Sequence, residues 1–170
     1  MTLNIKLNEL CNLIPDPKKG LGDDIFHFIS SLTPMVNVDL LIRNDKNETL
    51  LTWRHDKFHG PGWHIPGGII RFKETIEERL DQVAFQELKV KISHQKKPIL
   101  VETMLNNERD IRGHFISLLY ECKLKTALDP SMLFNPKNKV VGHWQWHNVC
   151  PNNIIKVQRR FKKYIDGNYE

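Results

Sequence analysis

One stretch decides the fold of this chain: Trp63-His64-Ile65-Pro66-Gly67-Gly68-Ile69-Ile70-Arg71-Phe72-Lys73-Glu74. Its two adjacent glycines let the backbone come close to a ligand, because no Cβ stands in the way. After them the apolar residues recur at helical spacing, at Ile76, Leu80, Val83 and Ala84. The sequence therefore predicts the end of a strand, a glycine loop and a helix that ends near Leu88.

Glu87 lies one turn beyond Val83, on the same helical stripe as Ile76 and Leu80. A carboxylate on a buried stripe is costly unless it has a partner. We therefore expect a cation or a hydrogen-bond donor beside Glu87, and two cations are open: a bound metal ion, or an internal arginine such as Arg54.

The stretch resembles the Nudix box, whose pattern is G-x5-E-x7-R-E-U-x-E-E-x-G-U with U an aliphatic residue; Gly68, Glu74 and Glu87 match it. The other charged positions of the pattern are replaced, its arginine by Gln82 and two of its glutamates by Val83 and Gln86. Within the Nudix hydrolases the chain resembles the GDP-mannose mannosyl hydrolases, in which the box is also degenerate.

The resemblance implies an α/β fold of the Nudix type, an α/β/α sandwich with a mixed β-sheet between helices. The chain has 170 residues, 40% of them hydrophobic and 26% charged, which is the balance of one compact domain. We expect an N-terminal arm and short helix at residues 1–34, and the Nudix domain at residues 35–170.

Apolar alternation predicts strands at 36–43, 49–54, 99–104, 114–124 and 140–146, the first two joined as a hairpin. A helix should begin at Asp23 or Asp24 and end before Pro34, and a last helix should run from a cap at Asn152 to Tyr164. Residues 1–22 carry two prolines and read as an arm, which either contacts a second subunit or covers the sheet.

The resemblance further implies a divalent metal, Mg²⁺ or Mn²⁺, as cofactor. Its ligands would be Glu87 and the main-chain carbonyl of Gly67 or Gly68, because these occupy the ligand positions of the resembled branch. Gln86 would add a neutral and therefore weaker oxygen donor. Such a small set suffices where water and substrate phosphates complete the coordination.

Asp39 and Arg54 match an aspartate within the first strand and an arginine ending the second strand of the resembled branch. The resemblance implies that Asp39 helps to define the nucleotide pocket and that Arg54 neutralises the diphosphate. From the residues alone, each has an ordinary alternative: Asp39 as a hydrogen-bonded residue of an edge strand, and Arg54 as a surface charge.

The general base is expected in a late loop, where the resembled branch has a Gln-His pair. An alignment on Trp144-Gln145-Trp146 puts Val140-Val141 at that pair. A shift of the loop would bring Asn138 or His143 to the site, and the imidazole of His143 has a suitable basicity near neutral pH. The alternative for His143 is a histidine that meets its partner within the sheet.

Two functions follow. The first is a Nudix-type hydrolase of a nucleoside diphosphate sugar, with a GDP-mannose-like substrate, metal-assisted chemistry, and Arg54 and His143 as catalytic residues. The second is a catalytically inactive Nudix-fold module that binds a nucleotide or a protein partner. The loss of charge at Gln82, Val83 and Gln86 motivates the second.

Composition limits the partners. The net charge of +5 is mostly local, in Lys96-Lys97 and in 159–163, and a solvated helix face explains the latter better than nucleic-acid binding does. No apolar run approaches the ~20 residues that span a bilayer, and three scattered cysteines suggest a reducing compartment. We expect a cytoplasmic protein, without membrane or nucleic-acid partners, that forms a homodimer as is common in the resembled family.

Overall fold

The structure is a computed structural model that describes residues 2–169. Its helices are α1 (Leu3–Asn12), α2 (Asp23–Ser30), α3 (Ile76–Leu88) and α4 (Lys162–Ile165), with short 3₁₀ turns η1 (Pro17–Lys19), η2 (Pro130–Met132) and η3 (Lys156–Phe161). Its strands are β1 (Met35–Ile42), β2 (Thr49–Arg54), β3 (Gly62–His64), β4 (Gly67–Ile69), β5 (Ile92–His94), β6 (Leu100–Leu105), β7 (His114–Leu124) and β8 (Trp144–His147).

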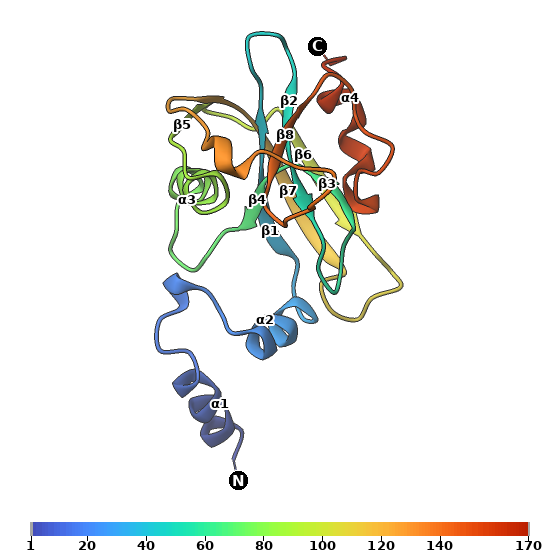
Figure 1. Cartoon of the computed structure of the whole chain (residues 1–170). Helices are drawn as coiled ribbons and strands as arrows, with labels where there is room; N and C mark the ends of the chain where they lie inside the picture. Colours follow the sequence, from blue (N-terminus) through green and yellow to red (C-terminus); the bar gives the residue numbers. More distant parts are fainter. Residues whose placement is uncertain (1, 170) are drawn as a thin grey trace.

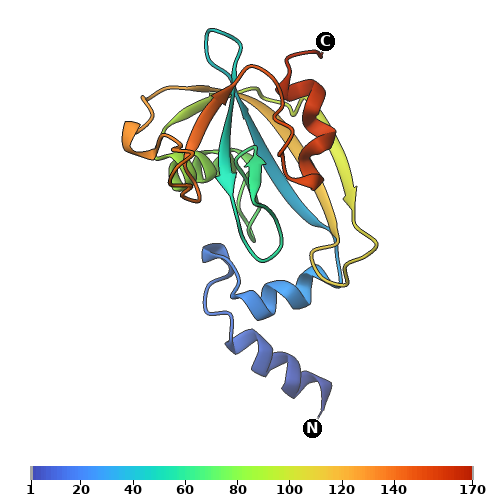
Figure 2. The same ribbon diagram turned by 45° about the vertical axis from the view of Figure 1, so that its right-hand side comes forward.

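The strands form two sheets between helices (Figure 1). The larger sheet has the order β4-β1-β7-β5, and β6 pairs with a different stretch of β7. This sheet is mixed, because β1 and β7 are parallel while its other pairs are antiparallel. The smaller sheet, β3-β2-β8, is antiparallel. With α3 on one side and α4 on the other (Figures 1 and 2), the α/β fold with a mixed sheet between helices is confirmed.

The central strand β1 divides the core by its alternation. Val38, Leu40 and Ile42 are buried with the apolar face of α3, whereas Leu41 belongs to a second buried cluster with Phe161 and other residues near the C-terminus. Successive side chains of a strand point to opposite faces. Asp39 therefore lies on the same face as Leu41, away from the helix-facing cluster.

The predicted helix is confirmed, whereas the predicted glycine loop is wrong, because Gly67 and Gly68 lie in β4 and pair with β1. Thr75 caps α3 by accepting a hydrogen bond from the Glu78 N–H, and the Glu78 side chain accepts one from the Thr75 N–H. This capping box fixes the start of the helix. The helix ends where Lys89 takes a left-handed conformation with φ of 58°.

The predicted hairpin is wrong, because its two strands belong to different sheets. Beyond a single bridge between Arg43 and Thr49, β1 pairs with β4 and β7, while β2 pairs with β3 and β8. The Asn44 side chain accepts hydrogen bonds from the Lys46 and Glu48 N–H groups and holds the turn. The turn was recognisable in the sequence, but the partners of the strands were not.

Two predictions near the C-terminus need correction. The strand expected at 140–146 is β8, which begins only at Trp144, because Gly142 makes a turn with φ of 85°. Asn152 caps no helix: the backbone at 153–155 pairs with Trp63, so that helical structure begins at Lys156, as the turn η3. The predictions at 99–104 and 114–124 are confirmed as β6 and β7, each within one residue.

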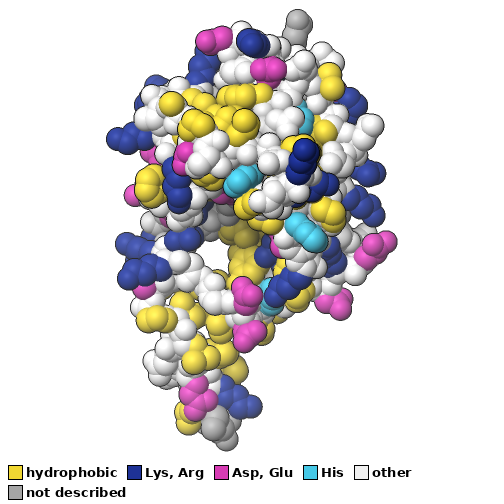
Figure 3. Space-filling model, viewed as in Figure 1, with side chains coloured by type: hydrophobic (Ala, Val, Ile, Leu, Met, Phe, Trp, Pro, Cys, Tyr) yellow, Lys and Arg dark blue, Asp and Glu magenta, His cyan; other side chains and the backbone are white. Residues whose placement is uncertain are grey.

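The first 22 residues contain a helix, α1, that the prediction of an arm did not include. In both ribbon views α1 lies farther from the sheets than α2 does (Figures 1 and 2). None of its residues is buried, and apolar side chains are exposed on it and around it (Figure 3): Leu3, Ile5, Leu7, Leu10 and Leu13. The helix α2 begins after Gly22 with Asp23 and Asp24 in its first turn, and ends before Pro34 as expected.

Candidate active site

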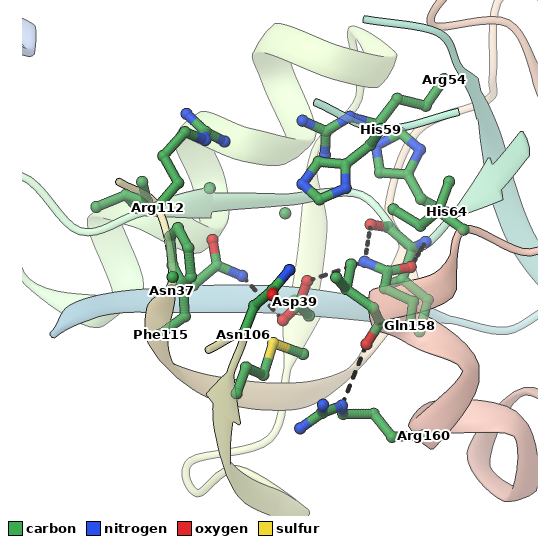
Figure 4. A pocket seen from close by; sticks show the side chains of 18 of the residues that line it. Asn37, Asp39, Arg54, His59, His64, Asn106, Arg112, Phe115, Gln158 and Arg160 are labelled. Atoms are coloured by element: carbon green, nitrogen blue, oxygen red, sulfur yellow. Dashed lines mark hydrogen bonds between the residues drawn. The ribbon is translucent and has the colours of Figure 1, made fainter. Parts of the chain in front are cut away.

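A cavity of about 200 Å³ lies between the edge of the larger sheet and the loops beyond it (Figure 4). Strands β1 and β4, the loop after β2, the loop between β6 and β7, and the turn η3 all contribute to it. Its polar and charged side chains are Asn37, Asp39, Arg54, His59, His64, Asn106, Arg109, Arg112, Gln158 and Arg160.

Asp39 is buried in the wall of this cavity, 2% exposed. Ser117 Oγ and Asn37 Nδ2 donate hydrogen bonds to its carboxyl group, and Gln158 Nε2 lies 3.4 Å from it. Burial raises the pKa of Asp39 to about 6, although these donors and the charge of Arg54 lower it. The carboxyl group is thus held in one orientation without an arginine or lysine bonded to it.

Glu87 reaches the same region from the C-terminal turn of α3. Its Oε1 accepts a hydrogen bond of 3.3 Å from the Gly67 N–H, which is the donor expected for it. Burial raises the pKa of Glu87 to about 7, against the Gly67 hydrogen bond and the charge of Arg54, and Asp39 raises it further. A Cβ on Gly67 would lie 2.5 Å from Asp39 Oδ1, so only glycine fits between the two carboxyl groups.

His64 adds an imidazole beside Glu87. Its Nδ1 lies 3.0 Å from the Thr52 carbonyl oxygen, to which it donates, so that in the neutral ring Nε2 carries no proton. This Nε2 lies 3.8 Å from Glu87 Oε2. Burial and the charge of Arg54 lower the pKa of His64 to about 4, and the ring is therefore neutral near pH 7.

The structure explains the residues that replace the charged positions of the Nudix box. A Cβ on Gly68 would lie 2.8 Å from Val83 Cγ2, so the first glutamate position has become part of the core. Gln82 and Gln86 are exposed and lie 3.5 Å apart, Nε2 to Oε1. Glu74, which the pattern would pair with an arginine at 82, instead binds Arg79 through two hydrogen bonds of 2.7 and 2.8 Å.

The predicted site residues fall into two groups. Asp39, Arg54, Gly67 and Gly68 line the cavity, and Glu87 is bonded to it through Gly67. Arg54 Nε is 2.5 Å from Asp56 Oδ2, so its bonded partner is Asp56 and not Glu87. Gln86 and His143 do not line the cavity. Gln86 is exposed on α3, and His143 accepts a backbone hydrogen bond from Trp53.

Sequence analysis missed several residues of the cavity. Gln158 binds the Ile65 main chain on both sides, accepting from its N–H at 2.6 Å and donating to its carbonyl oxygen at 3.2 Å. A buried glutamine next to Asp39 could not be recognised in a region that was expected to be a solvated helix. His59 and His64 were within the stretch studied, but lacked a partner at short spacing. Arg109 and Arg112 lie between two predicted strands, in a segment whose sequence indicated only a polar connection.

The oxygen donors at this end of the cavity fit a divalent cation such as Mg²⁺. The Asp39 carboxyl group is buried, the Glu87 side chain is 29% exposed, and the Gly67 backbone lies between the two. Within residues 2–169 no three His, Cys, Asp or Glu side chains gather as a metal cluster. The protein would thus supply few ligands, with water and phosphate oxygens as the remainder.

The fold and this site belong to a known class. A model of the NUDIX domain matches residues 33–150, and the chain is a member of the Nudix family. Membership supports a hydrolase, and Nudix hydrolases act on nucleotide-containing substrates, generally with divalent metals such as Mg²⁺. No helix within residues 2–169 is long and apolar enough to cross a membrane.

Individual relatives are more distant. The low-salt glycan biosynthesis protein Agl8 of Haloferax volcanii is 28% identical over 117 residues, which are 66% of this chain and 74% of that protein. The MutT protein of Methanosarcina mazei Go1 has a TM-score of 0.58 at 16% identity, covering 80% of this chain and 96% of that one. A UDP-X diphosphatase has a TM-score of 0.56 at 18% identity, covering 96% and 75%. These two structures share the fold.

Proposed function

We propose that the protein hydrolyses a nucleoside diphosphate linked to a sugar, with a GDP-mannose-like substrate and Mg²⁺ or Mn²⁺ as the cofactor. One observation carries the proposal: Gly67, Asp39 and Arg54 line one cavity, and Glu87 reaches its wall by accepting a hydrogen bond from the Gly67 N–H. The similarity to a protein named for glycan biosynthesis favours a nucleotide sugar over other nucleotides.

The residues have separate roles in this proposal. Glu87 and the Gly67 carbonyl oxygen hold the cation, with Gly68 allowing the close approach. A bound divalent cation neutralises the diphosphate and polarises the bond to be broken. Arg54 binds the diphosphate from the loop side, and Asp39 orients the nucleotide by its fixed hydrogen bonds. Gln86 is not assigned as a ligand of the cation, because its side chain is exposed.

The general base is better sought within the cavity than at His143. His64 lines the cavity and offers an unprotonated Nε2 beside Glu87, although burial and the charge of Arg54, which lower its pKa to about 4, make it a weaker base than a free imidazole. His143 does not line it, and its Nδ1 is buried with no hydrogen-bond partner among residues 2–169. We therefore assign proton acceptance from water to His64, and keep His143 as the residue to compare.

The test is hydrolysis of a nucleotide-sugar panel with Mg²⁺ or Mn²⁺, with the products identified. Free sugar with nucleoside diphosphate indicates attack at the sugar carbon, whereas sugar phosphate with nucleoside monophosphate indicates attack at phosphorus. Either product supports the proposal. No turnover on any substrate, together with absence of Mg²⁺ binding in calorimetry, would reject it in favour of an inactive binding module.

A homodimer in the cytoplasm completes the proposal. The exposed apolar residues of α1 support a contact between two copies, because such side chains are usually covered. Light scattering of the full chain and of a chain without residues 1–22 would test it. A monomer in both cases would contradict the dimer and leave the enzymatic proposal unchanged.

A further inference from the structure

Arginine side chains gather around His59, at the end of the cavity formed by the loop between β6 and β7. Arg109 and Arg112 come from this loop and line the cavity together with Arg54; Figure 4 labels Arg54, Arg112 and His59. Within residues 2–169 neither Arg109 nor Arg112 has a carboxylate within ion-pair distance, whereas Arg54 is bonded to Asp56 and Arg160 to Glu102. This end of the cavity has an excess of positive charge.

The structure holds Arg112 in place by several independent contacts. Its guanidinium group lies over the rings of Phe58 and Phe26, at 4.7 and 5.0 Å from their centroids. Its backbone N–H donates to Ser30 Oγ at 3.1 Å. Its backbone is in the left-handed region with φ of 55°, an uncommon conformation for a residue with a side chain. Two of these contacts come from α2, which gives the N-terminal segment a role at the cavity.

Despite these contacts, the polar groups of Arg112 are not all satisfied. Its Nε is buried and has no hydrogen-bond partner among residues 2–169. A buried donor without an acceptor is costly, more so on a charged group. Arg109 donates from Nη2 to the Phe58 carbonyl oxygen at 2.8 Å, which uses one of its five donors. A ligand cannot reach this buried Nε, but the terminal Nη1 and Nη2 of Arg112 are not buried and make no hydrogen bond within residues 2–169, so both guanidinium groups retain donors for a ligand.

The two ends of the cavity differ electrostatically. Of the arginines, Arg54 acts on the pKa of Asp39 and Glu87, and it lowers both. Arg54, Arg109 and Arg112 act together on His59, whose pKa burial and these charges lower to about 4. Arg54 is therefore shared by both ends, while Arg109 and Arg112 act at the second end alone. A diphosphate at Glu87 and Arg54 would leave this pair of arginines for another group.

We propose that Arg109 and Arg112 bind a second anionic group of the substrate, a carboxylate or phosphate beyond the diphosphate. The inference rests on the proposed function and narrows its substrate class. A nucleoside diphosphate linked to an acidic sugar carries such a carboxylate, and one linked to a phosphorylated sugar carries such a phosphate. A neutral nucleotide sugar has nothing to bind there. Planar guanidinium groups suit both anions, since each can receive paired N–H donors.

The test compares matched ligands that differ in this group alone. Calorimetry with Mg²⁺ would measure the binding of GDP-mannose and GDP-mannuronate, of UDP-glucose and UDP-glucuronate, and of GDP and GTP, whose third phosphate is the probe for a phosphate. We expect the member with the additional anionic group to bind at least about tenfold more tightly than its counterpart without it, because one charge-assisted pair is added. That preference should fall to about twofold or less in Arg112→Gln and in Arg109→Gln.

Two further variants separate charge from structure. Arg160→Gln changes an arginine of the same cavity that is paired with Glu102, and should keep the preference. Arg112→Lys keeps the charge and should restore most of the preference lost in Arg112→Gln, which a purely structural role would not predict. A preference for the uronates identifies a carboxylate, and a preference for GTP over GDP identifies a phosphate.

Other results would overturn the inference. Equal binding of the neutral and anionic members, with hydrolysis of both, would reject it and leave the proposed function intact. The same holds if Arg160→Gln and Arg112→Gln reduce the binding of all ligands by the same factor. No binding of any nucleotide would reject the proposed function, and the inference with it.

Discussion

The two ends of the cavity are built in different ways. At the carboxylate end, Asp39 and Glu87 lie on β1 and α3 and meet across the β4 backbone. At the arginine end, Arg109 and Arg112 lie in a loop that α2 supports from outside the matched Nudix segment. Regular elements hold groups more rigidly than loops do. The difference suggests that the first end carries the chemistry and the second selects the substrate.

The largest effect should come from the carboxylate end. Glu87→Gln should lower kcat/KM by roughly a thousandfold, because a cation ligand supplies several kcal/mol of transition-state stabilisation. Its apo form should keep its melting temperature, since burial already raises the pKa of Glu87 to about 7 and an amide is no harder to bury. Kinetics and calorimetric Mg²⁺ titration of the same preparations would measure both.

Gln86→Ala is the matched control for Glu87→Gln. Gln86 is the preceding residue of α3, but it is exposed and lies outside the cavity. We expect its kcat/KM to stay within about twofold of the unchanged protein, as for most exposed positions. If Gln86→Ala loses as much activity as Glu87→Gln, the assignment of the cation to the carboxylate end is incomplete. If Glu87→Gln keeps full turnover, that assignment is wrong.

A second effect concerns the support of the carboxylate end. Arg79 is 3% exposed and binds Glu74 where the chain enters α3. Arg79→Ala should lower the free energy of unfolding by about 3 kcal/mol, because it leaves a partly buried carboxylate without its cation. Urea denaturation would measure the loss, with Arg159→Ala as the exposed arginine for comparison. A Glu74→Gln, Arg79→Met double variant should regain stability, and failure to do so would point to lost packing instead of lost pairing.

The third prediction compares His64, which lines the cavity, with His143, which does not. His64→Gln should lower kcat about a hundredfold if its Nε2 accepts the proton of water. His143→Gln should leave kcat within about twofold, because His143 does not line the cavity. Steady-state kinetics with saturating substrate would measure both. If His143→Gln instead lost more of its kcat than His64→Gln, His143 would be the general base. The loop at 138–143 would then have to move toward Glu87 during turnover.

The same comparison explains how far sequence analysis reached. The carboxylate end was predictable, because a glycine pair, a capped helix and a carboxylate on its apolar stripe are local patterns. The place of Glu87 on this stripe follows from helical spacing, but its donor, the Gly67 N–H, was not named by the sequence, which offered a metal ion or Arg54 as the cation. The partner of Glu74 was less accessible: Arg79 lies one turn earlier than the pattern places its arginine, and only the geometry of the helix reveals the pair.

The arginine end was not predictable by these means. Arg112 depends on Phe26, Ser30 and Phe58, which are distant in sequence and come together only in the folded chain. The same reason accounts for the false hairpin. A local pattern indicates a strand or a turn, but the partner of a strand depends on the whole sheet. The left-handed backbone at Arg112, next to Gly113, had no distinct sequence signal.

The smallest predicted effect is a change in the pKa of His59, which reports the electrostatic effect of the arginines beside it. Burial and the charges of Arg54, Arg109 and Arg112 lower the pKa of His59 to about 4 from its ordinary 6.5. Arg112→Gln removes one of these charges and should raise the pKa of His59 by roughly half a unit to one unit. Titration of the imidazole by NMR would detect this shift. Arg160→Gln, at the paired arginine, should leave the His59 pKa unchanged.

The free energy of unfolding should depend on pH through His59, with a sign that follows from its lowered pKa. Because the pKa of His59 is lower in the folded chain, the unfolded chain takes up the proton first as the pH falls from 6.5 toward 4. The full shift would correspond to about 3 kcal/mol, but His59 is only half-buried and solvent screens the charges, so we expect the folded state to lose about 1 kcal/mol of stability from this residue over that interval. His59→Gln should have the same free energy of unfolding as the unchanged protein at neutral pH and a higher one below pH 6.5. Urea denaturation at both pH values would measure the difference. Parallel pH profiles for the two proteins would mean that the arginines do not act on His59, and that the cavity has one electrostatic environment instead of two.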